Sequence, residues 1–229
     1  MENTIIEDAK KYVSDLMSGD NSGHGMEHVN RVVELAMKFA KEERCNEDIV
    51  FLSALLHDVD DYKLFGTKNQ AELTNTNKIL NDIGAKENIK NAVLDIVGKI
   101  GYTKRLKGLT PSSIEGKIVS DADMCDAIGA NGILRTFQYS IKYGKPFFDK
   151  NVLPRNIVTA ENQIKKVADT CVCHMFEKLL KLYGLMLTDA GKKEAKQRHE
   201  FMILFLRQLF GEESASSWQK YLDDFLKTY

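Results

Sequence analysis

Apolar residues recur along most of the chain at spacings of three and four, which is the period of an amphipathic α-helix. In one such segment His28, Val32 and Leu35 fall on a single stripe, and in the next Ala54 and His57 do the same. Side chains at these spacings share a helix face. The pattern therefore predicts two successive helices that each turn an imidazole inward, towards the apolar core.

Breaks in this pattern divide the chain into predicted helices. In chain order these are residues 5–16, 26–39, 48–57, a segment ending at 84, 87–100, a segment that opens at 112–115, breaks at 129–132 and resumes to 143, then 159–183, 189–210 and 215–227. Residues 46–48 are expected to cap the third helix, and Ser112 and Glu115 have the spacing of a capping box. The predicted loops are residues 63–68, 101–111 and 144–156.

The composition fits a helical, globular protein. Only 3 prolines interrupt 229 residues, and 43% of the residues are hydrophobic, which is enough to bury a full core. No repeat, low-complexity tract or shift in composition marks a linker. We therefore predict an all-α fold of roughly nine to eleven helices in a single domain, residues 1–229.

Charge and cysteine content indicate which partners and which cellular compartment to expect. Lys and Arg number 32 against 33 Asp and Glu, so the net charge gives no sign of a nucleic-acid or membrane partner. The 4 cysteines are scattered rather than spaced as a disulfide framework, which favours a reducing compartment. There is no signal-peptide pattern and no apolar stretch of about 18 residues, so we expect a soluble, cytoplasmic protein, with other intracellular sites left open.

The strongest chemical signal is the junction at His57. The apolar run before it gives way to three carboxylates, Asp58, Asp60 and Asp61. A carboxylate this close to the core is normally neutralised, hydrogen-bonded or bound to a cation. With His28 from the preceding helix and an acid from the helix after residue 112, these side chains have the composition of a metal site built between helices.

Periodicity does not decide which acid the later helix contributes. Asp121, Asp123 and Asp126 all lie beside apolar residues, and Asp121 and Asp123 point in roughly opposite directions. These acids are either a polar helix face or inward ligands.

The donor set also indicates a type of metal. Two nitrogens with two carboxylate oxygens suit a divalent transition ion such as manganese, iron, cobalt, nickel or zinc better than magnesium or calcium, and manganese is the metal that we expect. Such an ion lowers the pKa of its water from about 15.7 towards 7 and screens the charge of a phosphoryl group. The site would therefore suit hydrolysis of a phosphoester or anhydride near neutral pH.

The order His28, His57-Asp58 and Asp123 resembles the H…HD…D signature of the HD-domain metal phosphohydrolases. Other stretches are similar to the small stand-alone HD proteins of the YedJ and YpgQ type. These are Gly23-His24-Gly25, Asp61-Tyr62-Lys63, Arg135-Thr136-Phe137, residues 177–182 and residues 198–202. The resemblance implies a helical HD-domain fold, with the HD motifs within residues 23–143 and C-terminal helices at 159–227 packed on the same core.

The same resemblance implies roles for individual residues. His28, His57, Asp58 and Asp123 would be the metal ligands. HD proteins with two metals usually carry additional histidines between the HD pair and the last aspartate, and this chain has none there, so the resemblance implies a single ion. Asp123 is preferred to Asp121 as the fourth ligand.

Asp61 is the candidate general acid or base. Asp60 is interpreted as an exposed loop carboxylate.

Several basic residues are candidate contacts for a substrate phosphate, and each also has an ordinary structural interpretation. Lys104, Arg105 and Lys107 form either a solvated basic turn or a phosphate-gripping loop. The candidate substrate-binding residues are His24, Arg31, Lys63, Arg105 and His174.

The resemblance to characterised HD proteins of this type implies hydrolysis of (deoxy)nucleoside triphosphates to monophosphate and pyrophosphate. A nucleoside 5′-monophosphate phosphatase and a catalytically inactive helical binding or regulatory protein are the alternatives. The expected partner is a small nucleotide, with neither a nucleic-acid polymer nor a membrane, and the oligomeric state is left open.

Overall fold

The computed structural model describes residues 3–18, 25–155 and 169–228, and within these ranges the chain forms helices and no strand. The all-α prediction is confirmed. The described residues contain twelve α-helices and one 3-10 helix, more than predicted. The chain forms two compact units, Met1–Asp123 and Met124–Tyr229, and the single domain stays a prediction.

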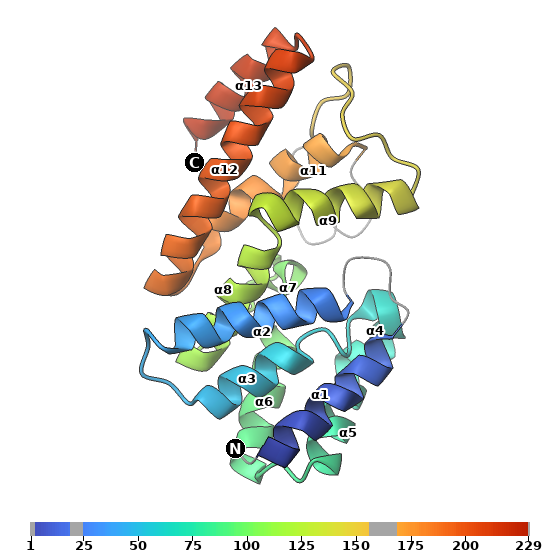
Figure 1. Cartoon of the computed structure of the whole chain (residues 1–229), viewed down its shortest axis with the longest axis vertical. Coiled ribbons are helices and arrows are strands. Elements are labelled where there is room, and N and C mark those ends of the chain that lie inside the picture. The colour runs from blue at the N-terminus through green and yellow to red at the C-terminus, as the bar shows by residue number, and fades with distance from the viewer. Residues whose placement is uncertain (1–2, 19–24, 156–168, 229) are drawn as a thin grey trace. The chain divides into compact units, whose positions relative to one another are not determined.

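The first unit is built around α3 (Figure 1). Its helices are α1 (Asn3–Met17), α2 (Met26–Ala40), α3 (Glu47–Leu56), α4 (Tyr62–Glu72), α5 (Thr74–Asp82), α6 (Glu87–Lys99), α7 (Tyr102–Leu106) and α8 (Ile114–Asp126), within which the unit boundary falls. Helix α3 packs against α2, α6 and α1. Leu52, Leu55 and Leu56 of α3 are buried in the apolar core that these helices share. The last turn of α3, where His57 follows, is therefore held from several sides.

The second unit has an aromatic core. Its helices are α9 (Gly129–Lys142), α11 (Cys171–Glu177), the 3-10 helix η1 (Leu179–Leu185), α12 (Asp189–Glu212) and α13 (Ser216–Leu226). Phe176, Phe210 and Trp218 are buried, with ring centroids 5.5 to 6.5 Å apart. The Trp218 indole N–H donates to the Lys150 carbonyl at 3.0 Å, so the polar edge of the ring is also satisfied.

Three expected segments differ from the structure. Residues 63–68 lie in α4 rather than in a loop, and Gly66 bends that helix with φ 86°. The segment 101–111 contains the short helix α7. The long helix expected over 159–183 is not continuous: residues 159–168 lie outside the described part, and α11 ends at Glu177 before the chain continues as η1. The break follows from Lys178, whose φ of −136° is not helical.

The capping signals also have a partly different outcome. Asn46 caps α3 as expected, because its side-chain oxygen accepts from the amides of Asp48 and Ile49. The capping box at α8 is shifted by one residue: the Ser113 hydroxyl accepts from the Gly116 amide at 3.1 Å. Glu115 does not complete a box, since its carboxylate accepts from the Asn46 amide at 2.9 Å and so joins α8 to the start of α3.

No helix within the described residues is both long and apolar enough to cross a membrane.

The burial of α3 gives a stability prediction. Leu52 is 0% exposed and Leu109, in the same unit, is 45% exposed. Leu52→Ala should lower the free energy of unfolding by about 2–5 kcal/mol, through lost burial and a residual cavity. The matched Leu109→Ala change should cost well under half of that, and urea denaturation of both variants measures the difference. Equal costs would contradict the central position of α3.

Candidate metal centre

His28 is delivered to the site by the first turn of α2. The helix opens at Gly25, whose carbonyl accepts from the amide of His28 at 2.9 Å. The buried residues Val32, Leu35 and Phe39 follow on the same face, so the imidazole is carried inward with them. Its side chain is 1% exposed. The inward orientation expected from the spacing is confirmed.

His57 follows the last residue of α3, and its tautomer is set by the backbone. Its Nδ1 lies 2.8 Å from the Ala54 carbonyl oxygen. A carbonyl can only accept, so Nδ1 carries the proton and donates it, which turns Nε2 towards the site. This is the arrangement of a metal-binding histidine whose second nitrogen is fixed by a backbone acceptor.

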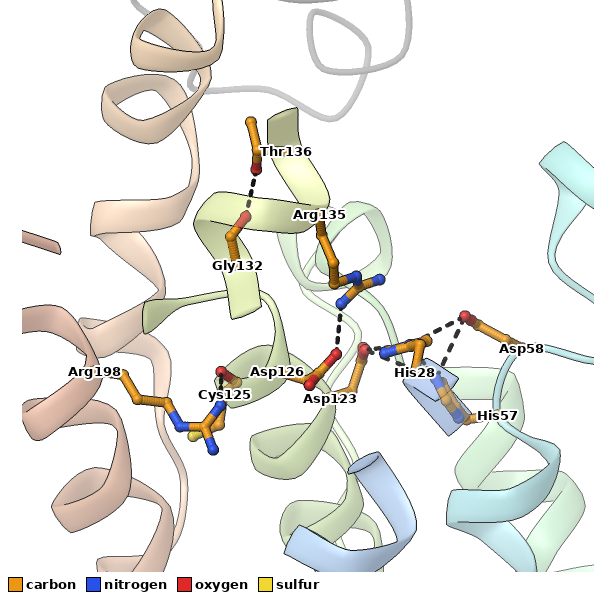
Figure 2. A network of polar contacts seen from close by, with 10 residues as sticks. All are labelled: His28, His57, Asp58, Asp123, Cys125, Asp126, Gly132, Arg135, Thr136 and Arg198. Atoms are coloured by element: carbon orange, nitrogen blue, oxygen red, sulfur yellow. Dashed lines mark hydrogen bonds and ion pairs between the residues drawn. The ribbon is translucent and has the colours of Figure 1, made fainter. Parts of the chain in front are cut away.

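The two imidazoles converge on one point (Figure 2). Their Nε2 atoms are 3.1 Å apart, and the rings meet edge to face with centroids 5.0 Å apart. The side chain of Asp58 closes the group, with Oδ2 3.4 Å from Nε2 of His28 and 3.5 Å from Nε2 of His57. The ligand atoms of these three residues all lie within 4.8 Å of one another, a spacing that can hold a metal ion.

Asp123 lies at the same point, from α8. Its Oδ1 is 3.6 Å from Nε2 of His28 and 3.8 Å from Nε2 of His57. Asp121 is fully buried two residues earlier. Residues two apart on a helix are separated by about 200° around its axis, so a helix that turns Asp123 to the imidazoles turns Asp121 elsewhere. The geometry favours Asp123 as the fourth donor, and its ligation stays a proposal.

Burial is uneven among the four donors. The two histidine side chains are each 1% exposed, whereas Asp58 and Asp123 retain 15% and 23% exposure. Within the described residues, the exposed part of the group therefore lies on its carboxylate side.

The cluster attracts positive charge. Burial opposes protonation of His57, but the carboxylates of Asp58 and Asp123 and the Ala54 carbonyl overcome it and raise the pKa of His57 to about 9. A divalent cation would meet the same favourable field with two imidazole nitrogens and two carboxylate oxygens as ligands. The donor set thus fits a transition metal ion chemically as well as geometrically.

Asp60 corrects an expectation from the sequence. It was expected to be an exposed loop carboxylate, but it is 2% exposed. Its two oxygens accept hydrogen bonds from the start of α5, fifteen and sixteen residues away. The sequence pattern around Asp60 does not predict these hydrogen-bond partners.

The other candidate residues of the first unit lie around this centre. Asp61 is half-buried at the start of α4, and Arg31 is half-buried one turn beyond His28. Arg105 lies on α7 and donates to the Thr110 hydroxyl at 2.9 Å. Lys63 belongs to α4, but its side chain is outside the described part of the structure.

Two further candidates lie outside the described part of the first unit. His24 lies outside the described residues, and His174 is half-buried on α11 in the second unit. The functional roles of all six of these residues stay predictions.

Lys104 is a residue that the sequence did not single out from its basic segment. Its Nζ donates to the Val97 carbonyl near the end of α6 at 2.9 Å. Burial lowers the pKa of Lys104, while the carboxylates of Asp61, Asp58 and Asp60 oppose that shift. The ammonium group is therefore held in the field of the acids that follow His57. The position of Lys104 depends on α7 folding back onto α6, which the sequence pattern does not predict.

Comparison with known proteins identifies the family to which this helical protein belongs. The HD domain family matches residues 25–128, a range that includes His28, His57, Asp58 and Asp123. The YpgQ protein of Bacillus subtilis is 33% identical over 204 residues, which cover 89% of this chain and 91% of YpgQ. The chain belongs to the HD domain family, and it is an enzyme of the HD-superfamily hydrolases.

Solved structures agree with this assignment. A Lactobacillus plantarum protein superposes with a TM-score of 0.80 at 33% identity, covering 94% of this chain and 98% of its own. An HD-superfamily hydrolase from Bacillus thuringiensis gives 0.72 at 33% identity, with 94% and 100% covered. The structure of B. subtilis YpgQ in complex with ADP gives 0.69 at 30% identity, with 89% and 97% covered.

HD domains bind divalent metals, and the convergence of two imidazoles generates a prediction. His57→Ala removes one nitrogen donor and the anchor to Ala54, so the protein purified without chelator should retain at most a tenth of the wild-type metal content. Inductively coupled plasma mass spectrometry measures this directly. His199→Ala is the control, because His199 is also a buried histidine but lies in the second unit, beside Tyr183. Unchanged metal in His57→Ala, or equal loss in both variants, would contradict the assignment.

Proposed function

We propose that this protein is a metal-dependent phosphohydrolase that converts (deoxy)nucleoside triphosphates to monophosphate and pyrophosphate. The observation that carries the proposal is the convergence of Nε2 of His28, Nε2 of His57, Oδ2 of Asp58 and Oδ1 of Asp123. These four residues would hold one divalent ion. When bound, the ion supplies Lewis-acid chemistry, which makes water a better nucleophile and screens phosphate charge.

The overall reaction is the attack of water on the α-phosphorus. A new oxygen–phosphorus bond forms, the bond from that phosphorus to the bridging oxygen breaks, and pyrophosphate leaves. The attacking water must lose a proton, and the half-buried carboxylate of Asp61 is our candidate to accept it. Asp61 comes three residues after Asp58, and its amide donates to the Asp58 carbonyl at 3.0 Å, so the two residues share one turn.

The negative charge of the phosphate chain needs cations besides the metal. Lys104 and Arg105 both lie on α7, and Lys104 is held in the field of Asp58 and Asp61. We assign to Lys104 a contact with a non-bridging phosphate oxygen, for which a half-buried ammonium group is well suited. Arg31, Lys63, His24 and His174 remain candidates for the rest of the substrate.

Nucleotide as the substrate class is supported by a relative rather than by this chain. YpgQ was solved in complex with ADP, and this chain covers 97% of that structure at 30% identity. The same donor set can act on a phosphoanhydride or on a phosphomonoester, depending on which phosphorus reaches it. Product identity therefore separates the two reactions.

The proposal is tested by incubating the protein, loaded with Mn²⁺, with a panel of ribo- and deoxyribonucleoside tri-, di- and monophosphates. We expect pyrophosphate and monophosphate from at least one triphosphate, with His57→Ala inactive. Repeating the panel with Fe²⁺, Co²⁺, Ni²⁺ and Zn²⁺ ranks the metals. Orthophosphate released from monophosphates alone would replace the proposal by a phosphatase. No turnover with any nucleotide by metal-loaded protein would refute it.

Lys104 gives a separate kinetic prediction. Lys104→Met keeps much of the side-chain volume but removes the charge, so KM for the best triphosphate should rise about tenfold, the effect of losing one charged hydrogen bond. Bound metal should stay at the wild-type level. Lys107→Met is the control, because Lys107 is exposed at the end of the same helix and should leave KM within about twofold. A KM that does not respond to Lys104→Met would remove this residue from the substrate site.

A further inference from the structure

Helix α5 lacks a capping side chain of its own. The residue before it is Leu73, which has φ 49° and offers no side-chain acceptor to the first turn. The early amides of a helix have no intrahelical partner, so a buried helix start normally needs an outside acceptor. In most helices that acceptor is the Ser, Thr, Asp or Asn at the N-cap.

Asp60 supplies the missing acceptor from fifteen residues away. Its Oδ1 accepts from the Asn75 amide at 2.8 Å, and its Oδ2 accepts from the Thr76 amide at 2.9 Å and from the Thr76 hydroxyl at 2.7 Å. Asn75 and Thr76 are the second and third residues of α5, whose amides an N-cap side chain ordinarily satisfies. A carboxylate at a helix N-terminus is also favoured by the helix dipole.

A fourth hydrogen bond, again from a donor on α5 to an acceptor in the turn, reinforces the connection. The Asn75 side-chain amide donates to the Val59 carbonyl at 2.6 Å. Both Val59 and Asp60 are therefore fixed to α5 through backbone or side-chain atoms. These two residues stand directly between Asp58, whose Oδ2 faces both imidazoles, and Asp61.

The turn is also restrained locally. The Val59 amide donates to the Leu56 carbonyl at 3.3 Å, the Asp61 amide donates to the Asp58 carbonyl at 3.0 Å, and the Val59 side chain is buried in the apolar core. A metal site requires its ligands to be held within about 0.5 Å of their productive positions. The local turn and the long-range cap together supply that restraint on the Asp58 side.

We propose that Asp60 is a positioning residue for the metal centre: its buried carboxylate caps α5 and thereby fixes the turn that presents Asp58 and Asp61. The proposal rests on the metal binding proposed above. It implies that the start of α5, which has no ligand of its own, is coupled to occupancy of the site. Metal binding should then stabilise the cap, and loss of the cap should weaken metal binding by the same coupling.

The test compares two helix caps of the same unit. Asp60→Ala removes the cap of α5, and Asn46→Ala removes the cap of α3, whose side-chain oxygen likewise accepts from two backbone amides. Full-length wild type and both variants, stripped of metal, are titrated with Mn²⁺ and the free ion is followed by electron paramagnetic resonance. We expect Asp60→Ala to raise the Kd for Mn²⁺ about tenfold or more, the usual effect of losing a group that orients a ligand. Asn46→Ala should lower the thermal midpoint but leave the Kd within about twofold.

A conservative variant and a labelling measurement keep the test decisive if Asp60→Ala fails to fold. Asp60→Asn retains one acceptor oxygen, so its Kd should lie between those of wild type and Asp60→Ala. In wild type, Mn²⁺ should slow hydrogen exchange of the Asn75 and Thr76 amides. Exchange that is insensitive to Mn²⁺, or a Kd in Asp60→Ala no higher than in Asn46→Ala, would overturn the positioning role.

The outcomes also separate this inference from the proposed function. If wild type binds Mn²⁺ and hydrolyses nucleotide while Asp60→Ala binds Mn²⁺ equally well, only the positioning role fails. If wild type itself binds no Mn²⁺, the proposed function fails and the positioning role fails with it.

Discussion

Two buried imidazole nitrogens 3.1 Å apart, with carboxylate oxygens 3.4 to 3.8 Å from them, impose a charge requirement on the first unit. The side chains of both histidines are almost fully buried, so water cannot supply the balancing interactions. In this arrangement the carboxylates raise the pKa of His57 to about 9, which means that they attract a proton despite the opposing effect of burial. A divalent cation satisfies the same requirement with more bonds. The fold around the site can be understood as the means of holding these four donors together.

Three separate helices provide the donors, and each is restrained by contacts outside the site. Helix α2 packs along α3 and brings His28, and the Ala54 carbonyl orients the ring of His57 at the end of α3. Glu115 joins the start of α8, which carries Asp123, to the start of α3. Asp60 joins the intervening turn to α5. The four donors are thus held by hydrogen bonds from residues outside the group, an arrangement common in metal centres of helical proteins.

The sequence was sufficient to predict those parts of the site that depend on helical periodicity. The inward orientation of His28 and His57 follows from their spacing to apolar neighbours, and the structure confirms both. The sequence was not sufficient where partners come from distant segments. Asp60 looks like a loop acid because its partners on α5 are fifteen and sixteen residues away, and Lys104 looks like its solvated neighbours until α7 folds back on α6. The break at Lys178 was also missed, because the apolar spacing before residue 183 is that of one continuous helix.

Membership of the HD family defines the class of the enzyme, but the substrate and the metal depend on details that the family does not fix. X-ray absorption spectroscopy of the protein loaded with Mn²⁺ tests the central claim most directly, because it reports the atoms bound to the ion. The account predicts one ion per chain, with two imidazole nitrogens and carboxylate oxygens in its coordination shell, and an imidazole signal reduced to that of one ring in His28→Ala. A coordination shell without imidazole, or one that is unchanged in His28→Ala, would contradict it.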